Sequence, residues 1–247
     1  MKADPTAQAA LLDLQAQDST LAQLAHRRSA LPEHARIAEL QAKFHELDGI
    51  RIEADTAVSD LTRDQRKADA EVEQVKTRRS RDEERLNSGA LSNPKDLASL
   101  QHELVALERR ISTLEDAELE VMEALEEAQT SLAAAEAELE VVRAELEQTQ
   151  TARDQAVAVI DEQAADAQAD RDRLAVTVPD DLIALYDKVR AQYGGLGAAA
   201  LKARRCEGCR LELNGADLRD LAAQPDDDVL RCPECSRILV RTAESGL

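Results

Sequence analysis

The stretch Arg85–Leu104, "RLNSGALSNPKDLASLQHEL", decides the fold because it interrupts a chain that otherwise favours helix over a long distance. Between residues 33 and 178 the only glycines are Gly49 and Gly89, and the only proline is Pro94. Glycine takes the left-handed conformation that ends helices, and proline suits the first turn of a new helix. The stretch therefore predicts two helices joined by a short loop.

The residues inside this loop carry the matching end signals. Asn87, Ser88 and Gly89 are expected to end the first helix. Either Ser92 or Asn93 is expected to cap the second helix, because short polar side chains accept hydrogen bonds from the free N–H groups of a helix start.

Apolar residues on both sides of the loop repeat at alternating intervals of four and three. The first seam has two polar interruptions and runs through Leu40, Phe44, Leu47, Arg51, Ala54, Val58, Leu61, Gln65, Ala68, Val72 and Val75. The second seam runs from Leu97 to Leu146, and Glu118 is its only residue that is not apolar. A repeat held over so many turns is typical of a coiled coil and argues against one isolated helix.

Two matching seams across a short loop predict an antiparallel hairpin of roughly 110 Å. If Leu86 lies opposite Leu97, then Leu40 lies near Arg143. A parallel dimer running through the loop is the alternative, and Pro94 disfavours it. A weaker seam precedes the hairpin, through Leu11, Leu14, Asp18, Leu21 and Leu24.

The chain divides by sequence into two parts. Residues 1–178 are expected to form the antiparallel coiled-coil hairpin, with a kink near residue 32 at Pro32 and a tip at 87–96. Residues 179–247 are expected to hold a bridging helix and a small zinc ribbon, because this part contains two CxxC pairs, at 206–209 and 232–235, whose spacing is typical of a zinc site. The predicted fold class is mainly α, with a small α+β module at the C-terminal end.

Composition narrows the possible functions. The 247 residues carry a net charge of -19, and only 1% are aromatic, so a large globular core is not expected. No segment is apolar enough to serve as a signal sequence or to span a bilayer, which predicts a cytoplasmic protein without a membrane partner. Twelve acidic residues and one basic residue fall between residues 112 and 150. This distribution argues against wholesale binding to polyanions.

Four cysteines give the one specific chemical signal. They form two CxxC pairs, Cys206 with Cys209 and Cys232 with Cys235. Two residues between cysteines let both thiolates face one ion, and four thiolates suit one structural zinc ion without an open position. A redox CxxC, a pair of disulfides and an iron–sulfur centre are the alternatives, and the missing βαβ context and the expected compartment disfavour the first two.

Basic residues supply two candidate binding surfaces. The hairpin tip, with neighbouring residues from both arms, offers Lys76, Arg78, Arg79, Arg81, Arg85, Ser88, Gly89, Asn93, Pro94, Lys95, Arg109 and Arg110. The ribbon offers Arg204, Arg205, Arg210 and Arg237, which could also help to keep the cysteines as thiolates. A modest charge excess on a helix is often only a solvated face, so a spacer without a binding tip is a further reading.

The hairpin, the tip sequence and the cysteine pairs together resemble the bacterial C4-type zinc ribbon family with an N-terminal coiled coil. The tip matches in Ser88, Gly89, Asn93, Pro94, Lys95 and Leu97, and the ribbon matches in Cys206, Gly208, Cys209, Cys232, Cys235, Arg237, Ile238 and Leu239. Ser236 departs from the family, which usually has glycine there. The resemblance implies an adaptor role, since members resemble adaptors of an alternative sigma factor and one binds a flagellin messenger RNA.

The sequence contains no serine-hydrolase elbow, phosphate-binding loop or zinc-protease motif, so we expect a protein that is not an enzyme and has no small-molecule substrate. A protein-binding adaptor is the first hypothesis. The second hypothesis is a nucleic-acid binder that contacts RNA or DNA through basic residues of the tip or through the ribbon arginines. The chain has few aromatic residues on which bases could stack.

Overall fold

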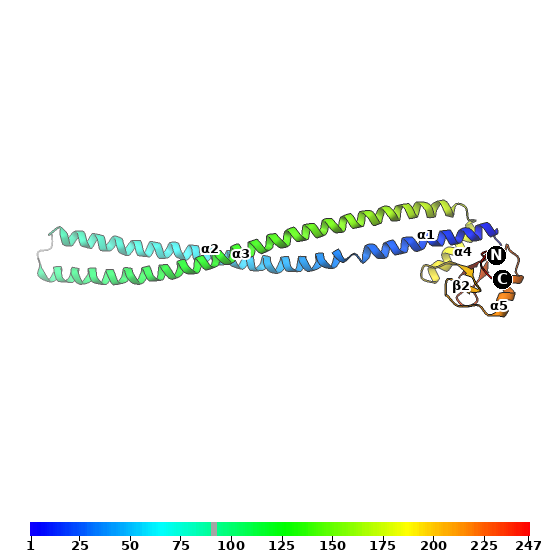
Figure 1. Ribbon diagram of the computed structural model, residues 1–247. Coiled ribbons are helices and arrows are strands. Elements are labelled where there is room, and N and C mark those ends of the chain that lie inside the picture. The colour runs from blue at the N-terminus through cyan, green and yellow to red at the C-terminus, as the bar shows by residue number, and fades with distance from the viewer. Residues whose placement is uncertain (90–92) are drawn as a thin grey trace. The chain divides into compact units, whose positions relative to one another are not determined.

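The structure is a computed structural model and describes residues 1–89 and 93–247. This part of the chain holds five helices and four short strands (Figure 1). The helices are α1 (Pro5–Ser29), α2 (Pro32–Asn87), α3 (Pro94–Ala175), α4 (Asp180–Gln192) and α5 (Gly215–Ala223). The strands are β1 (Ala198–Lys202), β2 (Arg205–Cys206), β3 (Leu230–Arg231) and β4 (Ile238–Val240). The predicted fold class, a long helical hairpin followed by a small strand-containing module, is confirmed.

Spatial contacts group the chain into two compact units. One unit, here called the hairpin unit, covers residues 35–149, and the other, the base unit, covers residues 1–34 and 150–247. The base unit therefore includes α1 and the end of α3 together with the ribbon. The sequence analysis places a domain boundary between residues 178 and 179, where the predicted hairpin gives way to the bridging helix and the ribbon. That boundary stays a prediction.

In the hairpin unit α2 and α3 lie side by side (Figure 1). Every residue of the two predicted seams is buried or half-buried. One apolar cluster of this seam consists of Leu40, Leu47, Leu139 and Val142, with Phe44 and Leu146 packed against it. Ion pairs flank the seam at Arg36–Glu145 (2.6 Å) and Lys76–Glu115 (2.7 Å). The position of Leu40 beside Val142 agrees with the register expected from the loop.

The helix ends lie where the sequence predicts them. The break between α1 and α2 falls directly before Pro32, and α2 ends at Asn87. Gly89 has a φ of 66°, the left-handed conformation that a side chain would strain. The side chain of Asn93 caps α3 by accepting a hydrogen bond from the N–H of Lys95 at 3.1 Å. The alternative cap, Ser92, lies outside the described residues, as does the part 90–92 of the predicted tip.

The base unit is built around a four-stranded sheet with the order β2-β1-β4-β3. The central strands β1 and β4 are parallel, with Ala198 opposite Ile238, and both outer pairings are antiparallel. The first residues of the chain extend this sheet, because the N–H of Val229 donates to the carbonyl of Met1 at 3.0 Å.

The main core of the base unit lies between α1, α4 and the sheet. Leu11 and Leu14 of α1 pack with Leu182 and Tyr186 of α4 and with Ile238 of β4. All five side chains are completely buried. Burial of such side chains stabilises a fold by about 1.5–3 kcal/mol each, so α1 and the ribbon hold one another in place.

Candidate metal centre and hairpin tip

Two tight turns of the ribbon carry the four cysteines. Cys206 ends β2 and begins the first turn, and Cys232 follows β3 and begins the second. The N–H of Arg210 donates to the carbonyl of Cys206 at 2.7 Å, and the N–H of Ser236 donates to the carbonyl of Cys232 at 2.8 Å. The two turns are therefore equivalent, and each one directs a pair of Sγ atoms to the same point.

The four Sγ atoms have the spacing that zinc requires. They lie within 4.8 Å of one another, and the Sγ–Sγ distances of Cys206 to Cys235 and of Cys209 to Cys232 are both 3.9 Å. Tetrahedral zinc with bonds of about 2.3 Å to sulfur places its ligands roughly 3.8 Å apart. The cysteines thus fit one zinc ion with four thiolate ligands. Because no coordination position is left open, the metal stabilises the fold and does not perform chemistry.

The surroundings of the thiols differ. Burial raises the pKa of the Cys232 and Cys206 thiols, because charge is disfavoured away from water. Burial also acts on Cys235, but hydrogen bonds from the backbone and side chain of Arg237 and from neighbouring cysteines outweigh it and lower its pKa to about 7. Arg237 therefore favours the ionised form of the Cys235 thiol, a role that the sequence suggested for the ribbon arginines.

Arg237 also connects the metal centre to the loop after α4. Its Nε donates to the carbonyl of Leu196 at 3.0 Å, and its Nη2 donates to the carbonyl of Tyr193 at 3.1 Å. The guanidinium lies 5.3 Å from the centre of the Tyr193 ring, within the range of a cation–π interaction. Arg237 is half-buried and fully engaged, so it acts as a structural link from the second cysteine turn to the loop after α4.

The other ribbon arginines lie at the surface. Arg204 lies in the β1–β2 turn, Arg205 begins β2, and Arg210 follows the first cysteine turn. All three side chains are exposed, and Arg205 pairs with Glu207 at 3.6 Å. A partner-binding role for these three residues stays a prediction.

A buried polar cluster in the base unit was missed by sequence reasoning. Asp18, placed in the weak seam of α1, is 1% exposed. Its carboxylate accepts hydrogen bonds from Arg171 Nε at 2.8 Å and from the Tyr186 phenol at 2.6 Å, and it pairs with Arg190 at 3.2 Å. Burial raises the pKa of the Tyr186 phenol, and the bond to Asp18 raises it further. The cluster joins α1, α3 and α4.

Gln15 of α1 completes this cluster on the side of the sheet. Its Oε1 accepts a hydrogen bond from the N–H of Gly197 at 2.7 Å and lies 3.2 Å from the Tyr186 phenol oxygen, and its Nε2 donates to the carbonyl of Gly195 at 3.0 Å. Gly197 is required here, because an added Cβ would meet the Tyr186 ring at 2.8 Å. A polar residue on an otherwise apolar helix face was the only sequence signal for either Gln15 or Asp18.

The basic residues of the hairpin tip fall into two groups. Four are paired with nearby acids: Lys76 with Glu115, Arg78 with Glu103, Arg79 with Glu83 and Arg85 with Asp82. The other four are exposed and form no ion pair within the described part of the chain, and they are Arg81, Lys95, Arg109 and Arg110. The remaining tip residues shape the turn, and Ser88 donates from its hydroxyl to the carbonyl of Arg85 at 2.9 Å.

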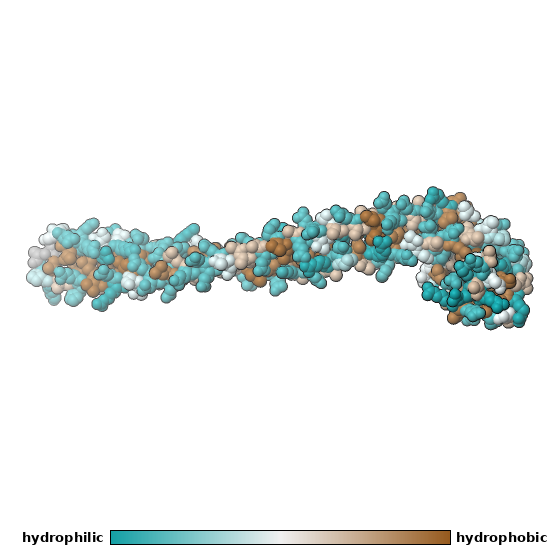
Figure 2. All heavy atoms as spheres, viewed as in Figure 1, coloured by the Kyte–Doolittle hydropathy of each residue, from teal (hydrophilic) through white to brown (hydrophobic). Residues whose placement is uncertain are grey.

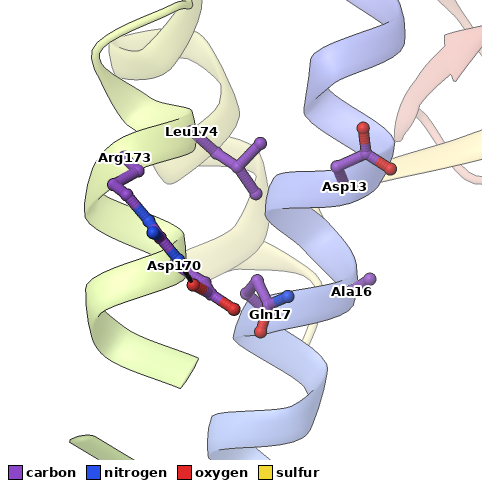
Figure 3. Close-up of a pocket in the computed structure, with 6 residues that line it drawn as sticks. All are labelled: Asp13, Ala16, Gln17, Asp170, Arg173 and Leu174. Atoms are coloured by element: carbon purple, nitrogen blue, oxygen red, sulfur yellow. Dashed lines mark hydrogen bonds and ion pairs between the residues drawn. The ribbon is translucent and has the colours of Figure 1, made fainter. Parts of the chain in front are cut away.

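Grooves occur in both units. In the base unit a groove of about 430 Å³ is lined by Asp13, Ala16 and Gln17 of α1 and by Asp170, Arg173 and Leu174 of α3 (Figure 3). Its arginine, Arg173, is already paired with Asp170. In the hairpin unit a larger groove of about 710 Å³ includes two of the unpaired tip arginines among its lining residues.

Two family models match the chain. The first is described as a CT398-like coiled coil hairpin domain and matches residues 14–194, and the second is a C4-type zinc ribbon domain that matches residues 205–239. The chain belongs to the CT398-like coiled-coil hairpin family. Neither description names an enzyme. Within the described residues, no helix has the length and apolar character needed to cross a membrane.

Similar proteins come from several bacteria. An uncharacterized protein of Mycobacterium tuberculosis is 39% identical over 241 residues, which are 98% of each chain. A solved structure from Mycobacterium smegmatis is 37% identical, with a TM-score of 0.84 over 98% of this chain and 100% of that chain. The structure of CT398 from Chlamydia trachomatis matches at 17% identity with a TM-score of 0.67, over 96% and 98% of the chains, and shows the shared fold alone.

Proposed function

We propose that this CT398-like protein is a non-enzymatic cytoplasmic adaptor that presents its hairpin tip, and secondarily its zinc ribbon, to a protein partner. The observation that supports this most is the group of four unpaired basic residues near the loop, Arg81, Lys95, Arg109 and Arg110. Elsewhere along α3, between residues 112 and 150, the charge is strongly acidic. Exposed cations without an ion pair, on a chain that is otherwise strongly acidic, can select a complementary partner.

Nucleic-acid binding is the alternative function, through the same tip residues or through Arg204, Arg205 and Arg210. Phosphates would have to approach a chain with a net charge of -19. Base stacking would have little support, because the three aromatic residues of the whole chain are Phe44, Tyr186 and Tyr193. These features favour a protein partner over RNA or DNA.

Site-specific photo-crosslinking tests the adaptor. A photoreactive residue is placed at Lys95 in the tip, and the control carries it at Val141, which is 68% exposed on the same helix. In the source bacterium, the adaptor function predicts a discrete protein adduct at position 95 that is absent at position 141. The same products at both positions, or none at either, would indicate a spacer.

Fluorescence anisotropy tests the alternative. Single-stranded RNA and duplex DNA are titrated with zinc-loaded protein across a salt series. We expect no binding at physiological salt. Affinity that falls steeply with salt, and is lost on reversal of Arg81 and Arg110 to glutamate, would instead favour nucleic-acid binding, since counterion release gives such binding a steep salt dependence.

A further inference from the structure

The groove on the hairpin unit combines apolar residues with three arginines and one glutamate in its lining. Val75 of α2 and Leu107 of α3 line it, and both belong to the seam. The rest of its lining consists of Ala70, Glu73, Gln74, Thr77, Arg78, Arg81 and Arg110. Along the hairpin, apolar residues show between polar ones in Figure 2. We call this surface the tip groove.

The three arginines of the tip groove differ in whether they form an ion pair. Arg78 is held by Glu103 across the hairpin. Arg81 and Arg110 are exposed and form no ion pair within the described residues. They come from opposite helices, so the groove has an available positive charge on each side. Since no acid of the described residues forms an ion pair with Arg81 or Arg110, an acidic ligand can pair with both.

The dimensions of the tip groove suit a helix. Its lining on α2 extends from Ala70 to Arg81, which corresponds to roughly 16 Å along the helix axis. That is about three helical turns, enough for apolar residues at positions i, i+3, i+4 and i+7. A third helix would cover the exposed part of half-buried Val75 and the remaining edge of Leu107, as in a helical bundle.

The charge distribution of the chain favours this groove over other surfaces as the binding site for an acidic helix. An acidic helix is repelled by the acidic face of α3, where Glu123, Glu126 and Glu127 line another surface hollow. A nucleic acid fits the tip groove less well, since its lining contains no aromatic side chain for base stacking.

We propose that the tip groove binds an acidic amphipathic helix of a partner protein. This rests on the proposed adaptor function and names the chemistry of its partner. Leucine-like side chains of the partner cover Val75 and Leu107, and glutamate or aspartate side chains pair with Arg81 and Arg110.

A helical peptide library tests the proposal without knowledge of the partner. Apolar positions of the displayed helix are kept as leucine or isoleucine, and the flanking positions vary among acidic, neutral and basic residues. The zinc-loaded full chain is compared with its Arg81→Glu/Arg110→Glu variant. Lys43→Glu is the charge control, because Lys43 is exposed on α2 and distant from the groove along the helix. Thr77→Trp fills the groove without a change of charge.

We expect at least tenfold enrichment of acidic flanks on the native chain and on Lys43→Glu, and loss of that enrichment on both groove variants. Equal selection on the native chain and the double variant, or enrichment of neutral or basic flanks, would overturn the proposal. Retained circular dichroism melting of each variant shows that the hairpin is folded.

The crosslinking at position 95 separates this proposal from the adaptor function. If the adduct persists in Arg81→Glu/Arg110→Glu, the adaptor function stands and the tip groove is not its binding site. If no adduct forms at position 95 in either protein, the adaptor function itself fails. Binding of RNA that competes with the acidic peptides would show a general polyanion site and would overturn selectivity for a helix.

Discussion

The Tyr186 phenol donates a hydrogen bond of 2.6 Å to the carboxylate of Asp18, and the two residues are 168 positions apart in the chain. Both side chains are completely or almost completely buried. The bond joins α4 to α1, and Arg171 brings the end of α3 to the same carboxylate. A single buried acid thus holds three helices of the base unit together.

Replacement of Asp18 should destabilise the base unit strongly. Asp18→Ala removes the acceptor that Arg171, Arg190 and the Tyr186 phenol share, and Arg171 keeps only its 3.5 Å pair with Asp187. Loss of one partner of a buried ion pair costs about 3–5 kcal/mol. Urea unfolding followed by tyrosine fluorescence measures this selectively, because both tyrosines lie in the base unit and the chain has no tryptophan. The control Asp13→Ala changes an exposed acid of the same helix and should have little effect. Equal midpoints for the two variants would contradict the structural role of Asp18.

Zinc removal should unfold the ribbon and leave most of the helical signal. The metal stabilises a module with few large apolar side chains, whereas residues 35–149 form a separate compact unit. Addition of a strong chelator should change tyrosine fluorescence and retain most of the circular dichroism at 222 nm. Cys232→Ser should show the same fluorescence without chelator. Unchanged fluorescence after complete zinc release would show that the ribbon does not depend on the metal.

Ser236→Gly should stabilise the ribbon. Ser236 has a φ of 59°, and this left-handed conformation costs a residue with a side chain about 1 kcal/mol relative to glycine. We expect a gain of about 1 kcal/mol in the free energy of unfolding, and slower zinc loss to a competing chelator. Ser236→Ala is the matched control, because alanine keeps the backbone strain. Equal stability of the glycine and alanine variants would mean that the strain is absent.

Glu118→Gln should stabilise the hairpin unit at neutral pH. A hydrogen bond with Asp69 raises the pKa of Glu118, because two carboxylates facing each other favour a shared proton. A pKa raised on folding contributes stability below the unfolded pKa, and this contribution disappears as pH rises through the folded pKa. The variant should therefore melt a few degrees higher than the native chain at pH 7, and this gain should disappear near about pH 4.

Thermal melts followed at 222 nm measure this difference. Glu120→Gln is the control, since Glu120 is exposed and lies outside the seam. A gain of the same size for both variants would point to net charge, and not to the Glu118–Asp69 contact, as the cause.

Local patterns were sufficient to predict the hairpin and the metal ligands. Helix ends depend on a few neighbouring residues, such as Gly89 and Asn93, and the seam depends on a spacing that every helical turn repeats. The cysteine turns are also local, because two residues between Cys206 and Cys209 already bring both thiolates to one side.

Contacts between distant segments could only come from the tertiary structure. Asp18 looked like a weak seam position, since Arg171 and Tyr186 approach it only after α1, α3 and α4 have packed. Arg237 likewise looked like one of several surface arginines, until the packing of α4 placed the Tyr193 and Leu196 carbonyls beside it. Charged groups become buried only where their partners converge, and that convergence depends on residues far away in the chain.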